Sequence, residues 1–255
     1  MPLDVASKRA RFRELHESGC FVIPNPWDIG SAKRLERMGF KAIASTSSGS
    51  AWAMGREDGQ MSRDEVLEHL RRLCDATDLP VNADFEAGFA DDLKQLAENV
   101  ILAVKTGVAG LSIEDYNNGR MCDLSEATER IAAAREAIQS SGANVLLVGR
   151  SEGFIRGKPD LDGTIKRLVS YSQAGANCLY APGVKDLSAI QTIVNALAPK
   201  PVNVLLNGPD LNVSDLAAIG VRRVSVGGAL AAQVWSAFDH AARTLRDQGT
   251  LPPRP

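Results

Sequence analysis

The sequence has little of what marks membrane, secreted or zinc-binding proteins. Among its 255 residues no apolar run is long enough to cross a bilayer, and the first ten residues lack the apolar segment of a signal peptide. The four cysteines, Cys20, Cys74, Cys122 and Cys178, are widely spaced and form no CxxC pair. This spacing argues against a zinc site and against a disulfide framework. We therefore expect a cytoplasmic protein.

The sequence also has only three histidines and no large excess of charge of one sign. The formal net charge is -2, which gives no basic surface for nucleic acid or for an anionic membrane. His16, His69 and His240 fall in helical patterns away from the predicted strand ends, so we expect structural or surface roles for them. Catalysis by histidine is disfavoured, and small-molecule chemistry is the better expectation.

Short apolar segments alternate with helical patterns along the chain. They predict eight strands, at 20–24, 41–45, 80–88, 110–115, 144–150, 176–181, 202–206 and 221–226. Ser62 and Glu65 form a capping-box pattern that predicts the start of one of the helices. Eight such units without a linker predict a single domain, residues 1–255, with an α/β fold, the (β/α)8 TIM barrel. A doubly wound open sheet is the alternative, but no Gly-rich dinucleotide-binding motif follows the first strand.

The third and fourth predicted strands end in carboxylates. Asp84 and Glu86 follow one apolar run and Glu114 follows the next, so the barrel would bring them together at one face, where they repel each other. A hard divalent cation with oxygen ligands would hold them, and Mg2+ commonly contacts one or two carboxylates directly and keeps several waters. We predict Mg2+, with Mn2+ as the alternative, bound directly by Asp84 and through water by Asp58, Glu86 and Glu114.

Other residues near these acids point to an anionic ligand. Arg150, at the end of the fifth strand, could pair in fork geometry with the carboxylate of a 2-oxo acid that chelates the cation, or it could neutralise Glu152. We predict the small residues of 46–51 to form a loop whose backbone N–H groups cradle an anion, with a plain flexible turn as the alternative. Asp115 could be the N-cap of the following helix.

At these positions the sequence resembles the isocitrate lyase/phosphoenolpyruvate mutase superfamily. The similarity lies in Ser45-Thr-Ser-Ser-Gly-Ser-Ala-Trp-Ala-Met-Gly-Arg-Glu-Asp58, Asn82-Ala-Asp-Phe-Glu-Ala-Gly88, Gly110-Leu-Ser-Ile-Glu-Asp115 and Gly149-Arg-Ser-Glu152. These motifs occur in the order that the family has and span nearly the whole chain.

The resemblance implies a barrel whose last helix is exchanged between subunits, in a tetramer built from two dimers. It implies Mg2+ at Asp84, supported by Asp58, Glu86 and Glu114. Substrate carboxylates would be held by the metal, by the segment Ser45–Gly49 and by Arg150. The family's chemistry makes or breaks a C–C or C–P bond through an enolate of the pyruvate type, and a cation on the ketone oxygen would stabilise the charge of that enolate.

The segment after the fourth strand departs from the family pattern. Members that cleave isocitrate or methylisocitrate carry a Lys-Lys/Arg-Cys-Gly-His motif there, whereas this chain reads Asp115-Tyr-Asn-Asn-Gly-Arg-Met-Cys-Asp-Leu124. Cys122 lies at about the family's distance from Glu114 without the surrounding lysine, glycine and histidine. Arg120 could lower the pKa of its thiol and Asp123 would oppose this, so Cys122 is either catalytic or an incidental loop thiol. The Lys and Asn of phosphonate-handling members are matched only by Asn117 and Asn118, out of register.

We therefore predict a Mg2+-dependent lyase that acts on a small 2-oxo acid or a 2-hydroxy acid precursor, as a homotetramer without a nucleic-acid or membrane partner. The predicted catalytic residues are Arg150, Cys122 and Tyr180, and the predicted substrate-binding residues are Ser45, Thr46, Ser47, Ser48, Gly49, Arg150 and Asn207. Two alternatives remain. One is C–P bond chemistry on a phosphonate, and the other is a protein that binds 2-oxo acids with little turnover.

Overall fold

The computed structural model describes residues 3–253, so the two residues at each end of the predicted domain lie outside the described part. Eight parallel strands follow the order β1-β10-β9-β8-β7-β4-β3-β2. The Ala44 amide donates to the Pro24 carbonyl at 3.0 Å and joins the two ends of this sheet. The predicted barrel is therefore confirmed, and the open sheet is wrong. The strands are β1 (Phe21–Ile23), β2 (Ile43–Ala44), β3 (Val81–Asp84), β4 (Gly110–Glu114), β7 (Leu146–Arg150), β8 (Cys178–Tyr180), β9 (Val202–Leu205) and β10 (Arg223–Ser225).

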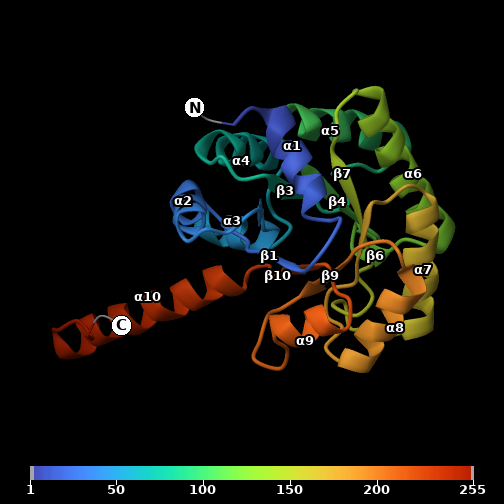
Figure 1. Cartoon of the computed structure of the whole chain (residues 1–255). Coiled ribbons are helices and arrows are strands. Elements are labelled where there is room, and N and C mark those ends of the chain that lie inside the picture. The colour runs from blue at the N-terminus through green and yellow to red at the C-terminus, as the bar shows by residue number, and fades with distance from the viewer. Residues whose placement is uncertain (1–2, 254–255) are drawn as a thin grey trace.

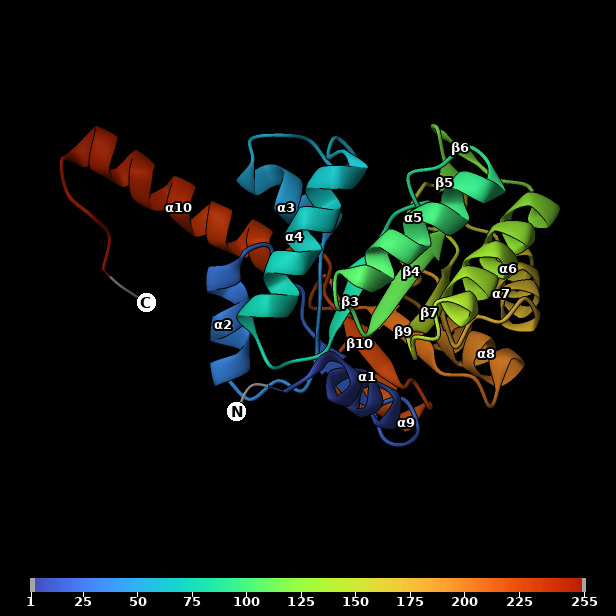
Figure 2. The same cartoon turned by 90° about the horizontal axis from the view of Figure 1, so that it is seen from above.

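Helices cover the outside of the barrel (Figure 1; Figure 2). Their apolar faces pack on the strands, and the resulting core includes fully buried Leu70, Leu96 and Ile113. None of the helices in residues 3–253 is long and apolar enough to cross a membrane. The helices are α1 (Val5–Glu14), α2 (Ile29–Arg37), α3 (Ser47–Ala53), α4 (Arg63–Ala76), α5 (Leu93–Lys105), α6 (Leu124–Ser140), α7 (Leu161–Gln173), α8 (Leu187–Leu197), α9 (Val213–Ala218) and α10 (Ala229–Gln248).

Side-chain caps fix where the helices begin. α4 starts at the predicted capping box, in which the Ser62 hydroxyl accepts from the Glu65 amide and the Glu65 carboxylate accepts from the Ser62 amide at 2.9 Å. α6 starts at Asp123, which accepts from the Glu126 amide at 2.8 Å. These bonds satisfy amides that have no partner within the helix, so the segments between strands adopt a defined length and direction.

The predicted loop at 46–51 is wrong, because this segment begins the helix α3. The Thr46 side chain is its N-cap and accepts from the Gly49 amide at 3.3 Å. A Cβ added at Gly49 would lie 2.8 Å from Thr46 Cγ2 and 3.0 Å from Trp27 Cβ. Glycine therefore lets the first turn of α3 pack tightly beside the end of β2.

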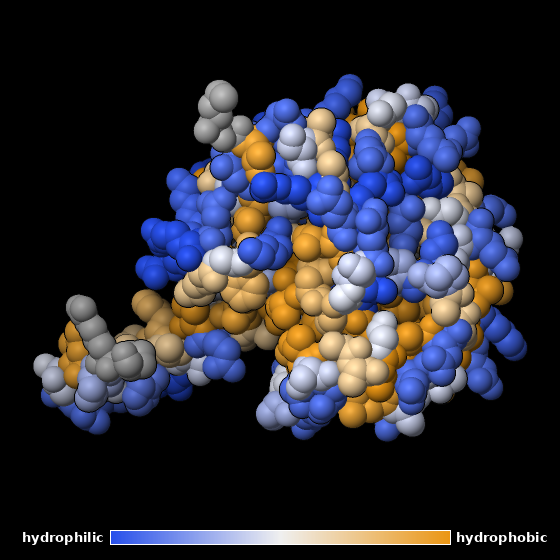
Figure 3. Space-filling view, in the orientation of Figure 1, coloured by the Kyte–Doolittle hydropathy of each residue, from blue (hydrophilic) through white to orange (hydrophobic). Residues whose placement is uncertain are grey.

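The last helix, α10, points away from the barrel (Figure 1). Of its residues only Ala231 is buried, while Val234 and Phe238 are 51% and 60% exposed. Apolar surface continues from the body onto this helix (Figure 3). Exchange of α10 between subunits stays a prediction, and its exposed apolar side chains are what an exchanged helix would carry.

Candidate active site

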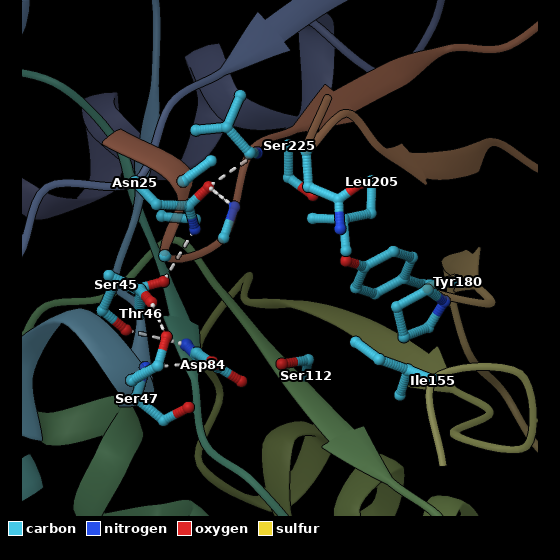
Figure 4. A pocket seen from close by; sticks show the side chains of 18 of the residues that line it. Asn25, Ser45, Thr46, Ser47, Asp84, Ser112, Ile155, Tyr180, Leu205 and Ser225 are labelled. Carbon is cyan, nitrogen blue, oxygen red and sulfur yellow. Dashed lines mark hydrogen bonds between the residues drawn. The ribbon is translucent and has the colours of Figure 1, made fainter. Parts of the chain in front are cut away.

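The carboxyl ends of the strands surround a cavity of about 320 Å3. Side chains from β3, β8, β10 and the segments after β1 and β2 line it. The close-up shows Asn25, Ser45, Thr46, Ser47 and Asp84 on one side of the open space and Ile155, Tyr180 and Leu205 on the other (Figure 4). This is the face of a parallel barrel on which catalytic groups are found.

Asp84 ends β3 and ties three strand ends together. Its Oδ2 accepts from the Ser47 amide at 3.2 Å, and its Oδ1 accepts from Arg150 Nη1 at 3.0 Å. The Asp84 amide donates to Ser45 Oγ at 2.8 Å. The structure thus brings together four residues that the sequence predicted to share a site.

The predicted anion-binding segment divides into two parts. Ser45, Thr46, Ser47 and Ser48 line the cavity, and the Thr46 and Ser48 hydroxyls lie 3.1 Å apart. Gly49 is buried behind Thr46 and does not line the cavity, so its predicted contact with substrate is not supported. The Ser47 amide already donates to Asp84, so this turn positions a carboxylate of the protein itself.

Arg150 ends β7 among three carboxylates. Besides Asp84, its Nη1 lies 3.5 Å from Glu114 Oε2, and its Nε donates to Glu152. Burial alone would lower the pKa of the guanidinium, but the charges of Glu152, Glu114 and Asp84 raise it, so Arg150 is a permanent cation. The expected pairing of Arg150 with Glu152 is confirmed, and Arg150 also lines the cavity, while its pairing with a substrate carboxylate stays a prediction.

Glu86 lies in a loop that two buried side chains hold. Glu86, Gly88 and Phe89 have positive φ angles of 48°, 82° and 54°. Arg130 Nη2 donates to the carbonyls of residues 87 and 90 at 2.6 and 2.9 Å. Asn99 Nδ2 donates to those of residues 88 and 89, both at 2.9 Å. All four successive carbonyls are bonded, which keeps a strained loop in one conformation.

Burial and mutual repulsion raise the pKa values of two acids at this mouth. Burial, followed by the charges of Asp84 and Asp58, raises the pKa of Glu86 to about 7. Burial also raises the pKa of Glu114, against the opposing charge of Arg150. Asp58 is exposed and lines the mouth. The four predicted metal-site acids therefore share one region with an excess of negative charge.

The donor set fits an ion that keeps most of its water. Within residues 3–253 no group of three or more His, Cys, Asp or Glu side chains converges closely enough to enclose a metal. Asp84, Glu86 and Glu114 nevertheless supply carboxylate oxygens around Arg150. Burial, followed by the charges of Asp84 and Asp58, raises the pKa of Glu86, and a cation would offset the cost of ionising this group. Mg2+ contacts one or two carboxylates in such sites and holds others through water.

Tyr180 and Asn207 both line the cavity, and Tyr180 lies on the side opposite Asp84 (Figure 4). The Arg150 guanidinium lies over the Tyr180 ring, 5.4 Å from its centroid. Burial raises the pKa of the Tyr180 hydroxyl to about 12, so this group stays protonated at neutral pH. It can donate a hydrogen bond to a ligand. At neutral pH it is not present as the phenolate, which is the form that could accept a proton as a general base.

Cys122 lies apart from the cavity. A hairpin of β5 (Tyr116–Asn117) and β6 (Arg120–Met121), which the sequence did not reveal, precedes it. The Cys122 side chain is fully buried, and burial raises the pKa of its thiol to about 11. Arg120 is paired with Glu126 at 2.8 Å, and its charge lowers the pKa of the thiol by less than burial raises it. This placement does not support the predicted catalytic role of Cys122.

Asp115 has a structural role other than the expected N-cap. Its Oδ1 accepts from the Glu152 amide at 2.7 Å, and its Oδ2 accepts from the Tyr171 hydroxyl at 2.7 Å and from Arg167 Nη1 at 3.2 Å. This buried carboxylate fixes the backbone of Glu152, the residue that holds Arg150 Nε.

The histidines lie away from the site, as expected. His16 is buried with Nδ1 2.7 Å from the Phe12 carbonyl oxygen, and His69 lies 3.1 Å from the Ser50 hydroxyl. His240 is exposed on α10. None of the three lines the cavity around Asp84.

Four further residues that line the cavity were not predicted from the sequence. They are Asn82 on β3, Ser112 on β4, and Arg223 and Ser225 on β10. No sequence pattern distinguishes an arginine that points into the barrel from one on the surface, so the position of Arg223 could not be predicted. Asn82 lies in a family motif, and its period-two relation to Asp84 could have placed it in the barrel interior.

The closed barrel, with acids at the ends of β3 and β4 and an arginine at the end of β7, defines a TIM-barrel enzyme with a polar mouth. The family model described as phosphoenolpyruvate phosphomutase matches residues 12–246. The chain belongs to this family of lyases and mutases, within the isocitrate lyase/phosphoenolpyruvate mutase superfamily, and the resemblance seen in its motifs is confirmed.

Solved and curated relatives agree with this membership. A crystal structure from Burkholderia cenocepacia J2315, provisionally described as a lyase/mutase, is 43% identical with a TM-score of 0.94 over 97% of this chain and 91% of that one. The 2-methylisocitrate lyase of Escherichia coli is 28% identical over 84% of this chain and 76% of its own. The oxaloacetate decarboxylase of Pseudomonas aeruginosa is 28% identical over 87% and 79%.

Proposed function

We propose that the protein is a Mg2+-dependent lyase that breaks a C–C bond in a small 2-oxo acid, with an enolate of the pyruvate type as the leaving fragment, or in a 2-hydroxy acid precursor. Cleavage of the 2-hydroxy acid would release the 2-oxo acid itself and leave the electron pair of the broken bond on the other fragment. The observation that carries this proposal is the joining of Asp84, Arg150 and Glu114 at the mouth, next to Glu86 with its raised pKa. Relatives named as a lyase and as a decarboxylase support the C–C branch.

Asp84 would bind the cation directly, with Asp58, Glu86 and Glu114 holding its waters, and Mn2+ is the alternative ion. When bound, the ion would supply positive charge beside the ketone oxygen, on which negative charge grows as the bond breaks. The Ser47 amide and the Ser45 hydroxyl, which contact the carboxylate and the amide of Asp84, would keep its oxygens oriented.

Arg150 would bind the substrate carboxylate. A guanidinium has five N–H donors, and contacts to the protein engage Nη1 and Nε. Arg150 lines the same cavity as the hydroxyls of Thr46, Ser47 and Ser48, and Nη2 would supply the donors for the substrate. Asn207, on the rim of the same cavity, would contact the variable end of the substrate.

The proton chemistry follows from the pKa values. Tyr180 would donate a hydrogen bond to the substrate, because its hydroxyl keeps its proton at neutral pH. Glu86, whose pKa is raised to about 7 by burial and by the charges of Asp84 and Asp58, would lose its proton when the cation binds and would then hold one of the waters of that ion. Cys122 takes no part, since its thiol is buried and protonated.

The proposal is tested by turnover of a panel of oxaloacetate, methylisocitrate and phosphonopyruvate with Mg2+, in the wild type and in Asp84→Ala. Mg2+-dependent cleavage of a C–C substrate that Asp84→Ala lacks is the expected result. Turnover of phosphonopyruvate alone would replace the proposal with C–P chemistry. No turnover across the panel, together with tight oxalate binding, would replace it with a 2-oxo acid binding protein.

A further inference from the structure

Arg223 lies at the floor of the cavity, inside the barrel. It begins β10, is 3% exposed and lines the same cavity as Asp84. Its Nε donates to Asn203 Oδ1 at 2.9 Å, and its Nη1 lies 3.3 Å from Asn82 Oδ1. Both partners are neutral amides.

The charge of Arg223 has no counter-charge nearby. Among residues 3–253 no carboxylate oxygen lies within 4.0 Å of its guanidinium nitrogens. Burial, followed by the charge of Arg223 itself, lowers the pKa of His16 to about 3, so this neighbour is neutral. Burial raises the pKa of the Cys178 thiol, which is neutral too. A buried cation without an acid is costly to the fold, so a function for it has to be sought.

Hydrogen-bond donors remain free at this floor. The two recorded bonds of Arg223 involve Nε and Nη1, and Nη2 has no recorded partner in the described part of the chain. Asn203 uses its Oδ1 on Arg223 and donates from Nδ2 to Ser225 Oγ at 2.9 Å. Ser225 accepts in that bond, and its hydroxyl also contacts the Tyr180 hydroxyl, so the free donors at the floor are those of Arg223 Nη2.

The floor lies one layer below the acids. Asn82 and Asp84 are two residues apart on β3, so they face the same side about 6.6 Å apart along the strand. The cavity therefore has acids and Arg150 at its mouth and a cation with neutral donors at its base. An elongated ligand with an anionic group at each end matches this distribution of charge.

We propose that Arg223 forms a carboxylate-binding subsite at the floor of the cavity, which selects substrates with a second carboxylate beyond the one bound at Arg150. Arg223 offers Nη1 and Nη2 as a fork. The inference rests on the proposed function and narrows its substrate class to 2-oxo or 2-hydroxy diacids.

Calorimetric titration of the Mg2+-loaded protein with two matched pairs of ligands tests this subsite. The pairs are 2-oxoglutarate with 2-oxopentanoate and malate with 2-hydroxybutanoate, in which a methyl group replaces the second carboxylate. In the wild type the affinity of at least one diacid should exceed that of its matched monoacid by a ratio of about ten or more, which is the effect of a charge-assisted hydrogen bond. In Arg223→Met this ratio should fall close to one.

Two controls make the result specific. Arg222→Met makes the same change of charge one residue earlier, where Nη1 donates to the Gly19 carbonyl outside the cavity, and should keep the wild-type ratio. Arg223→Gln keeps an amide donor toward Asn203 and should also lose the ratio, so it replaces Arg223→Met should that variant fail to fold. Oxalate should bind with Mg2+ in all folded variants.

Each outcome is decisive. A ratio near one in the wild type, or a ratio unchanged in Arg223→Met or Arg223→Gln, overturns the subsite while oxalate binding keeps the proposed function. Failure of oxalate to bind the wild type with Mg2+ overturns the proposed function and this inference with it.

Discussion

Replacing Arg150 with methionine removes a cation that contacts three carboxylates. The guanidinium lies 3.0 Å from Asp84 and 3.5 Å from Glu114 and donates to Glu152. The four side chains are between 1% and 16% exposed, so solvent screens these pairs weakly. Methionine keeps much of the volume of the side chain, so the change tests charge more than packing.

The loss of stability should be large at alkaline pH. Breaking a buried ion pair by removing one partner costs about 3–5 kcal/mol, because the remaining charge stays buried without compensation. Here three acids lose the same partner, and we expect the free energy of unfolding to fall by about 3–5 kcal/mol at pH 8.

The loss should shrink at lower pH. Burial raises the pKa values of Glu86 and Glu114, so the folded state binds more protons than the unfolded state and stability falls as pH rises. The charge of Arg150 opposes both shifts, so its removal raises these pKa values further. At pH 5.5 Glu86 is largely protonated, and the loss should be smaller by about 1 kcal/mol or more.

Urea unfolding at the two pH values, without added divalent cations, measures both effects. Arg156→Met is the matched control. Arg156 lies 3.3 Å from Glu152 and 3.8 Å from Glu114 but is 40% exposed, so we expect a loss below about 1 kcal/mol. A loss of that small size in Arg150→Met, or an equal loss at both pH values, would refute the account of the acid cluster.

Three further predictions concern single residues. Since Glu86 loses its proton with a pKa of about 7, the Mg2+ affinity of the wild type should rise between about pH 6 and pH 8. Calorimetry should find that Glu86→Gln binds Mg2+ more weakly and with an affinity that depends less on pH. Cys122→Ser should keep wild-type turnover, and a fall in the turnover rate of more than about tenfold would show that the buried thiol takes part in the reaction. Phe238→Asp, on the exposed face of α10, should dissociate the predicted tetramer in analytical ultracentrifugation, and an unchanged mass would exclude that face from the interface.

The parts of the fold that are set by local sequence were predictable. Apolar runs bounded by Gly or Pro gave the eight strands, and the capping box at Ser62 gave the start of α4. The acids Asp84 and Glu114 were placed at one mouth because strand ends share a face in this architecture. The segment after Thr46 was misjudged because its serines and glycine resemble a loop, whereas a threonine cap begins a helix there.

The remaining features depend on contacts between distant parts of the chain. Arg223 lies 3.3 Å from an amide 141 residues earlier in the sequence, and no local pattern announces such a pair. The clamp of Arg130 on the loop of Glu86 likewise joins residues about forty apart. The inactivity inferred for Cys122 follows from burial, which spacing alone cannot supply.

Titration of oxalate, a mimic of the pyruvate enolate, into the wild type and Asp84→Asn, each with and without Mg2+, tests the central claim most directly. The account predicts binding in the wild type that requires Mg2+ and that Asp84→Asn loses. Equal binding with and without the ion, or binding that survives in Asp84→Asn, would contradict a metal site at Asp84 and with it the proposed lyase mechanism.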